Sequence, residues 1–174
     1  MFGFTKKHNY NTEECYKHIS NSLISISKNE TIKVFGFVSS NKKADFLDNV
    51  VKNIAKRTSE KDIRTLVINV VFDSESSFHF KEKFKLGDVC CIECKNILAD
   101  KFTEELSKQI DKYNLILVSI NSITSKAEAL EYTKSCKNII IVEKCTECYY
   151  ADYENMFVNF KSAGIKPLGV ITAV

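Results

Sequence analysis

Glycine is scarce in this sequence, which has five glycines in 174 residues and none between Gly36 and Gly87. Loops that bind the phosphates of ATP or GTP need glycines, because their backbone N–H groups must converge on phosphate oxygens. Such loops also carry a lysine for the phosphates and a serine or threonine for magnesium. The chain has no segment in which these residues occur together. A standard phosphate-binding loop is therefore excluded.

Long apolar runs, a signal peptide and a strong net charge are also missing. No run approaches the roughly 20 apolar residues that span a bilayer, and the first seven residues lack the apolar segment and cleavage site of a signal peptide. The net charge is only +3, and the lysines are interleaved with Glu and Asp. This pattern favours a solvated mixed surface over nucleic-acid binding. We therefore expect a cytoplasmic protein that neither binds nucleic acid nor inserts directly into a membrane.

The apolar residues gather in six short runs rich in β-branched side chains, at residues 32–38, 65–71, 88–92, 114–120, 138–142 and 168–172. Several runs are apolar almost throughout, which is typical of strands covered on both faces in a parallel sheet. Alternation of such strands with amphipathic helices predicts right-handed βαβ units. The expected fold class is α/β, a three-layer α/β/α sandwich with a mostly parallel sheet, in which residues 1–174 form a single domain.

Four helices are predicted because apolar residues recur on one helical face. These sets are Tyr16, Ile19, Leu23 and Ile26; Leu47, Val50, Val51 and Ile54; Phe102, Leu106 and Ile110; and Tyr153, Met156, Phe157 and Phe160. Gly164 is expected to end the last helix as a C-cap. Residues 72–86 are polar and show no strong period, so we expect a surface loop there.

Three collinear segments resemble bacterial tyrosine kinases of capsular polysaccharide synthesis, the BY-kinases, within the MinD/ParA group of P-loop proteins. Residues 14–23 are similar to the helix before that family's first strand. Residues 32–40, with the helix ending at residues 53–55, are similar to the strand, Ser-Ser turn and helix around its Walker A phosphate loop. Residues 163–171 are similar to its final passage from helix to strand. The resemblance implies a P-loop NTPase-like fold of the SIMIBI type.

Aligned in this way, the nucleotide-binding positions carry unsuitable residues. Leu47 stands where the family has its phosphate-binding lysine, and Asp48 where it has the magnesium-binding serine or threonine. Asn69 and Val71 fall at two acidic positions of the second strand, and Ser119 replaces the Walker B aspartate. Four parts of the phosphoryl-transfer apparatus are thus absent together. The resemblance therefore implies a degenerate nucleotide site without catalytic residues.

Two alternatives at this turn stay open at the level of sequence. The turn either corresponds to a phosphate loop that has degenerated or belongs to a fold that merely resembles one, and both predict no ATPase activity. Lys42 and Lys43 either form a weak anion site near a helix start or are simply exposed to solvent. The second interpretation of these lysines is favoured.

The first predicted helix carries part of the family's ring-assembly motif, Glu-x-x-Arg-x-x-Arg. Glu14 is present, Lys17 replaces the first arginine and Ser20 replaces the second. Lysine is a poorer bidentate partner than arginine. Glu14 and Lys17 are therefore candidates for contacts between copies of the chain, while ring formation of the family type is in doubt.

Two Cys-x-x-Cys pairs, Cys91 with Cys94 and Cys145 with Cys148, lie near the ends of predicted strands. Together they could supply four thiolates to zinc or an iron–sulfur cluster. However, the pairs lie about fifty residues apart, far more than in zinc ribbons. Unrelated, reduced cysteines in the cytosol are the favoured interpretation, so we expect no cofactor.

These observations give three hypotheses of function. The first is a catalytically inactive BY-kinase-like domain that acts as a regulatory or scaffold partner in capsular or exopolysaccharide synthesis. The resemblance implies that its partner is a protein, with a membrane-bound polysaccharide chain-length regulator as the candidate. The second is a residual nucleotide-binding tyrosine autokinase, and the third is a metal-carrying scaffold built on the Cys-x-x-Cys pairs.

Overall fold

The computed structural model describes residues 12–40, 44–72, 79–95, 97–121, 123 and 127–173. These residues form the helices α1 (Thr12–Glu30), α2 (Ala44–Ser59), α3 (Ala99–Ile110), α4 (Ala127–Cys136) and α5 (Tyr150–Ala163). They also form the strands β1 (Val34–Val38), β2 (Thr65–Val71), β3 (His79–Leu86), β4 (Val89–Lys95), β5 (Leu115–Ile120), β6 (Ile139–Lys144) and β7 (Pro167–Ala173). Strands and helices alternate as the sequence predicts, except at β3.

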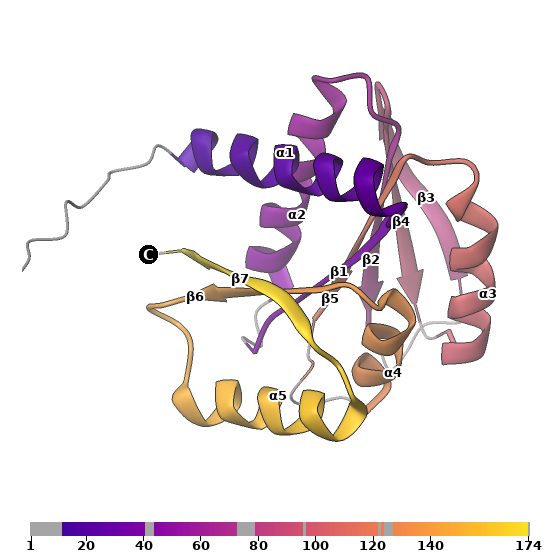
Figure 1. The fold of residues 1–174 in the computed structure, drawn as a ribbon. Helices are drawn as coiled ribbons and strands as arrows, with labels where there is room; N and C mark the ends of the chain where they lie inside the picture. Colours follow the sequence, from indigo (N-terminus) through magenta and orange to yellow (C-terminus); the bar gives the residue numbers. More distant parts are fainter. Residues whose placement is uncertain are drawn as a thin grey trace, which may run out of the picture.

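The strands form one sheet in the order β3-β4-β2-β5-β1-β6-β7. All neighbouring pairs are parallel except β3 and β4. Helices α1 and α2 lie on one face, and α3, α4 and α5 lie on the other (Figure 1). The expected three-layer α/β/α sandwich with a mostly parallel sheet is therefore confirmed.

Two apolar cores fill the space between the sheet and its helices. Phe35 and Phe37 of β1 are fully buried on the α1–α2 face, whereas Phe102 and Phe160 are buried on the opposite face. Every residue of β5 is buried, as expected for a central strand of a parallel sheet. Gly164 adopts a left-handed conformation with a φ of 69° at the end of α5, which confirms the predicted C-cap.

The expectation of a surface loop over residues 72–86 is wrong for its second half, which forms β3. This strand pairs antiparallel with β4 at the edge of the sheet. The two strands are joined by Gly87 and Asp88, and Gly87 has a positive φ of 55°, which suits a tight hairpin. Phe80, Phe84 and Leu86 recur at even positions between lysines. A period of two is typical of a strand, but the many lysines between the apolar residues obscured this pattern.

A glycine is required at position 36, where β1 approaches the end of α4. A Cβ atom added at Gly36 would lie 2.8 Å from Cδ1 of Ile139 and 2.9 Å from Cβ of Cys136. Both distances are shorter than ordinary carbon contacts. The close approach lets the Gly36 N–H donate to the Asn138 carbonyl at 2.8 Å, and so helps to join β1 to β6.

We expect Gly36→Ala to lower the free energy of unfolding by about 1–3 kcal/mol, because the added methyl overpacks this contact. Gly169→Ala is the matched control, since nothing lies within 4 Å of the Cβ position at Gly169. This control should change stability by no more than about 0.5 kcal/mol. Urea unfolding of the two variants and the wild type measures both effects, and equal midpoints would contradict the packing argument.

Candidate functional site

Polar side chains collect at the edge of the sheet where the parallel strands end, the edge at which open α/β sheets bind ligands. They are Ser39 and Ser40 after β1, Asn69 in β2, Ser119 and Asn121 at the end of β5, Glu143 in β6, and Asp48 on α2. We call these seven residues the carboxyl-edge cluster. All except Asp48 are at most 7% exposed. Burial of polar groups is costly unless they are hydrogen-bonded, and several members of the cluster bond to one another.

Glu143 organises one half of the carboxyl-edge cluster. Its carboxylate accepts the backbone N–H of Ser40 at 2.7 Å and the hydroxyl of Ser39 at 3.4 Å. The hydroxyl of Ser40 lies 3.5 Å from Sγ of Cys148, which follows β6. The backbone N–H of Ser40, which begins the turn after β1, is therefore already bonded to a carboxylate of the protein.

Asp48 organises the other half. Its Oδ1 atom accepts the hydroxyl of Ser119 at 2.5 Å and the side-chain amide of Asn121 at 3.3 Å. The first contact is short, as is common where a hydroxyl donates to a carboxylate oxygen. These bonds hold the start of α2 against the end of β5.

The electrostatic field of the cluster is negative near Glu143. Burial raises the pKa of the Cys148 thiol, and Glu143 raises it further, although the hydrogen bond with Ser40 acts in the opposite direction. Burial also raises the pKa of the Tyr153 hydroxyl, and Glu143 again adds to the effect. Two different groups thus respond to the same buried carboxylate. An anion placed here would meet the same unfavourable charge.

Two hydrogen-bond acceptors of the cluster are buried without a partner. The Oδ1 atoms of Asn69 and Asn121 are buried, and neither has a hydrogen-bond partner among the described residues. Asn69 lies beside Ser119, its register partner on β5. Phosphate groups bring acceptor oxygens and need donors. These two acceptors are complementary to a hydrogen-bond donor and would give no bond to a phosphate oxygen.

The other residues predicted for the nucleotide site are placed as follows. Leu47 is fully buried in the core on the α1–α2 face, so the position aligned with the phosphate-binding lysine packs apolar atoms. Lys42 and Lys43 lie outside the described residues. The structure brings Asp48 and Ser119 into direct contact, with Asn69 alongside.

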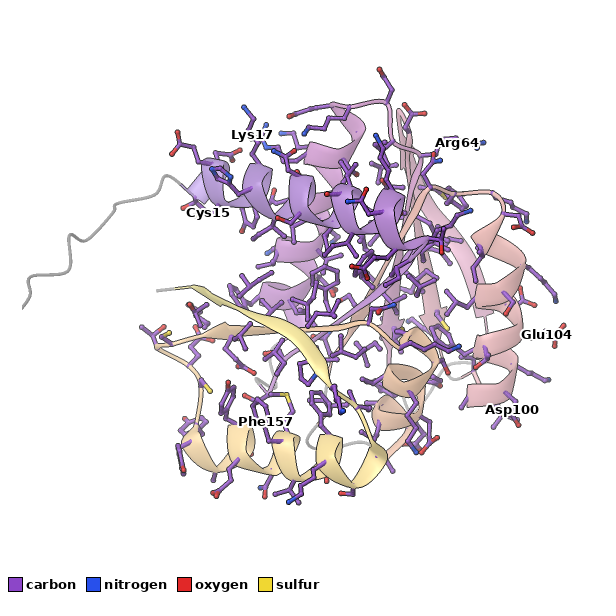
Figure 2. The ribbon with its side chains drawn as sticks, viewed as in Figure 1. Cys15, Lys17, Arg64, Asp100, Glu104 and Phe157 are labelled. Atoms are coloured by element: carbon purple, nitrogen blue, oxygen red, sulfur yellow. The ribbon has the colours of Figure 1, made fainter. Side chains whose placement is uncertain are left out.

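The candidates for contact between copies lie on α1. Glu14 and Lys17 are both exposed, and Lys17 is labelled on this helix in Figure 2. The adjacent Glu13 forms an ion pair with Arg57 of α2. Exposure leaves Glu14 and Lys17 accessible to another chain, and their role in assembly stays a prediction.

Sequence reasoning missed Glu143, Asn121 and the contact of Cys148 with Ser40. A signal for Glu143 was present, because it follows four consecutive apolar residues of a predicted strand. An acidic residue at the end of such a strand lies at the ligand-binding edge of a parallel sheet. The contact between Cys148 and Ser40 joins residues 108 positions apart, so no local pattern could have shown it.

The structure does not bring the four cysteines of the proposed metal site together. Cys91 points into the core on the α1–α2 face and Cys94 into the core on the other face. Cys145 and Cys148 follow β6, which is four strands away from β4, a separation of about 19 Å at the usual strand spacing. Among the described residues, no group of three or more His, Cys, Asp or Glu is placed to hold a metal ion. The alternative in which these four cysteines together bind one metal ion or cluster is therefore wrong.

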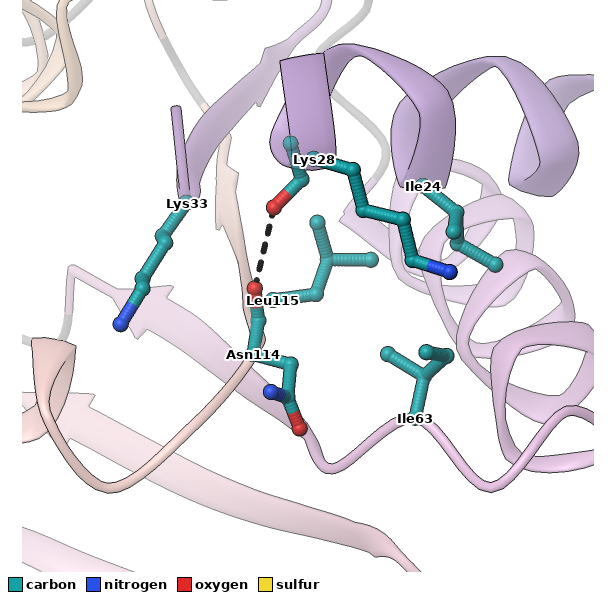
Figure 3. A pocket seen from close by; sticks show the side chains of 7 residues that line it. Ile24, Lys28, Lys33, Ile63, Asn114 and Leu115 are labelled. Carbon is teal, nitrogen blue, oxygen red and sulfur yellow. Dashed lines mark hydrogen bonds between the residues drawn. The ribbon is translucent and has the colours of Figure 1, made fainter. Parts of the chain in front are cut away.

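A cavity of about 160 Å³ lies at the opposite edge of the sheet, where β1 and β5 begin. Ile24, Ile63 and Leu115 contribute apolar side chains, with Lys28, Lys33 and Asn114 around them (Figure 3). Lys33 already donates to the Ile110 carbonyl at 3.0 Å, and Ser27 donates to the Asn114 carbonyl at 3.2 Å. These polar groups bond to the protein itself. The cavity is separate from the carboxyl-edge cluster.

The fold and the position of the cluster define a class of structure: a three-layer α/β sandwich with its polar site at the carboxyl ends of β1, β2, β5 and β6. No protein-family model and no curated protein matches the sequence. Within the part of the chain that the structure describes, no helix is both long and apolar enough to cross a membrane.

Solved structures give the more particular comparison. The BceF tyrosine kinase domain is similar with a TM-score of 0.74 and 9% identity, over 92% of this chain and 76% of that one. The kinase domain of the Escherichia coli tyrosine kinase ETK is similar with a TM-score of 0.71 and 15% identity, over 97% and 84%. A ParA family ATPase from Chlorobium tepidum is similar with a TM-score of 0.61 and 13% identity, over 80% and 72%. The fold is thus BY-kinase-like and MinD/ParA-like, as the sequence predicts.

Proposed function

We propose that this chain is a BY-kinase-like domain that does not transfer phosphate and acts as a regulatory or scaffold partner in capsular or exopolysaccharide synthesis. The observation that carries the proposal is the carboxyl-edge cluster. Two of its donors are used within the protein, since Glu143 accepts the Ser40 N–H and Asp48 accepts the Ser119 hydroxyl. The nucleotide site of the related fold is therefore replaced by an internal hydrogen-bond network.

The charges of this network support the same conclusion. A carboxylate about 4 Å from a phosphate oxygen is repelled by about 4 kcal/mol at the effective dielectric constant of a protein surface. The cluster contains two carboxylates, Glu143 and Asp48, and the buried Leu47 supplies no compensating ammonium group. Loss of several kcal/mol is enough to weaken nucleotide binding by orders of magnitude.

The protein-contact part of the proposal rests on the resemblance to BY-kinases. The proposed partner is the cytoplasmic part of a membrane-bound polysaccharide chain-length regulator. Glu14 and Lys17, exposed on α1, are the proposed contact points between copies in an oligomer. We also propose that the chain is cytoplasmic and that it holds no bound cofactor.

We expect isothermal titration with ATP or ADP and magnesium to give no binding heat, because the Ser40 N–H and the Ser119 hydroxyl are bonded to carboxylates of the protein and Leu47 supplies no ammonium group. The kinase domain of ETK, titrated under the same conditions, is the positive control. Thermal unfolding with nucleotide provides a second readout, since saturation at 100 times Kd would stabilise a binding protein by about 2.7 kcal/mol. Micromolar binding of nucleotide would reject the proposal.

A residual tyrosine autokinase is the second candidate, and one observation favours it. Tyr149 and Tyr150, at the start of α5, are 75% and 79% exposed and so are accessible acceptors for a phosphoryl group. Incubation with labelled ATP, followed by detection of phosphotyrosine, separates the two candidates. Labelling of the wild type that is lost in the Tyr149→Phe, Tyr150→Phe double variant would establish the autokinase.

A further inference from the structure

The second Cys-x-x-Cys pair occupies a turn beside the carboxyl-edge cluster. Residues 145–147 form a turn directly after β6, in which the Glu147 N–H donates to the Lys144 carbonyl at 2.9 Å. The side chains of Lys144 and Glu147 also form an ion pair. Cys145 lies in this turn and Cys148 follows it, immediately before α5. The hydrogen bond and the ion pair therefore both enclose Cys145, and Cys148 is the next residue along the chain after Glu147.

This pair differs from the other cysteines in accessibility. All seven cysteines are free thiols, of which Cys90, Cys91, Cys94 and Cys136 are buried, Cys15 and Cys148 are half-buried, and Cys145 is exposed. Burial raises the pKa of Cys94 to about 12 and raises that of Cys136 as well. Buried, protonated thiols react slowly. Cys145 is the exposed thiol, and Cys148 is its neighbour in the same turn.

The backbone geometry is compatible with a bond between the two sulfur atoms. Disulfides span Cα separations of about 4.4–6.8 Å, which two cysteines separated by two residues can reach when the chain bends between them. The chain turns over residues 145–147, and Cys148 follows this turn directly. Cys145 also contributes to the raised pKa of Cys148. The hydrogen bond between Cys148 and Ser40 is a weak 3.5 Å contact with sulfur. Breaking it costs little.

We propose that Cys145 and Cys148 form a reversible disulfide, with a low-molecular-weight disulfide such as oxidised glutathione as the oxidant. The Cys145 thiolate attacks one sulfur of the oxidant, forms a mixed disulfide and releases one glutathione thiolate. Cys148 then loses its proton and attacks the Cys145 sulfur, which expels the second glutathione. Two protein thiols are oxidised, one glutathione disulfide is reduced to two thiols, and the two protons end on the released thiols.

The disulfide would change the surface next to the carboxyl-edge cluster. Cys148 would exchange its contact with the Ser40 hydroxyl for a covalent bond to Cys145, while Ser40 would keep its N–H bond to Glu143. Cytosolic disulfides are typically transient and redox-sensing. This inference is independent of the proposed function, because it rests on the β6–α5 turn and does not depend on nucleotide binding.

The test is incubation of the full chain with oxidised glutathione, followed by mass spectrometry and peptide mapping without reduction. We expect the mass to fall by two hydrogens, two of the seven thiols to become unreactive towards iodoacetamide in denaturant, and the Cys145–Cys148 link to appear. Dithiothreitol should reverse all three changes. A stable glutathione adduct on the wild type, a link to another cysteine, or no loss of thiols would overturn the proposal.

Single serine variants resolve the order of the two steps. Cys148→Ser should stop at a mixed disulfide, with one glutathionyl group attached to Cys145. Cys145→Ser should lose the disulfide and react much more slowly, because the half-buried Cys148 remains. Cys15→Ser is the matched control at a half-buried thiol on α1 and should behave as the wild type. Circular dichroism checks that each variant is folded.

Discussion

Glu143→Ala is expected to lower the free energy of unfolding by about 2–4 kcal/mol. The substitution leaves the buried Ser40 N–H without its acceptor, and an unsatisfied buried group costs about 1–3 kcal/mol. A small cavity adds to the loss. The variant no longer buries the Glu143 carboxylate, and this gain offsets part of the loss in stability. Urea unfolding measures the change.

Glu143→Gln is the matched control for this prediction. The glutamine has nearly the same shape, and its carbonyl oxygen can still accept the Ser40 N–H, so we expect a loss of only about 1 kcal/mol. Equal unfolding midpoints for the alanine and glutamine variants would show that the acceptor role of Glu143 is wrongly assigned.

The glutamine variant has a second, independent readout at Cys148. Glu143 contributes to the raised pKa of this thiol, and a neutral amide removes that contribution. The pKa of Cys148 should therefore fall towards its ordinary value, while burial still keeps it raised. Measured in a Cys145→Ser background, the alkylation of Cys148 should reach its half-maximal rate at a lower pH than with Glu143 present.

Phe102→Ala is expected to have the largest effect on stability, a loss of about 3–5 kcal/mol. Phe102 is fully buried and packs 5.0 Å, between ring centroids, from Tyr132 of α4. Only Phe102 and Leu106 of α3 are buried. The substitution would therefore remove one of the two buried side chains that hold this helix against the sheet. The expected loss is a large part of the 5–15 kcal/mol that stabilises an ordinary domain.

Leu98→Ala is the control for Phe102, because Leu98 precedes α3 and is 71% exposed. We expect it to change stability by less than about 0.5 kcal/mol. Hydrogen exchange adds a local readout, since amides of α3 should exchange much faster in the Phe102 variant than those of β5. A loss below 1 kcal/mol for Phe102→Ala would contradict the role of this side chain in anchoring α3.

The fold was largely predictable because strand and helix periods are local properties of the sequence. The run from Leu115 to Val118 indicated a strand buried on both faces, and all of β5 is buried. The strand β3 was missed because its lysines lowered the average hydrophobicity of a segment whose alternation was otherwise clear. An edge strand needs such charges to avoid pairing with other chains. The lysines that protect β3 from such pairing therefore also obscured its strand pattern in the sequence.

The candidate site was only partly predictable. Alignment placed Leu47, Asp48, Asn69 and Ser119 at the positions of a nucleotide site, and the structure shows Asp48 bonded to Ser119. No sequence pattern indicated that Asn121 would join this pair or that Glu143 would bind Ser40. Such contacts depend on how β5, β6 and α2 are placed in three dimensions. Residue types alone do not fix that placement.

The contact between Asp48 and Ser119 has a consequence for sequence change over time. In the aligned family positions, the hydroxyl belongs to the helix and the carboxylate to the strand, and here the two are exchanged. Ser119→Asp alone would set two carboxylates against each other, and Asp48→Thr alone would leave the Ser119 hydroxyl without its carboxylate acceptor. Each single substitution towards the pair of the aligned family is therefore disfavoured. Only a change of both residues together keeps a hydroxyl opposite a carboxylate, so the two positions are expected to change as a pair.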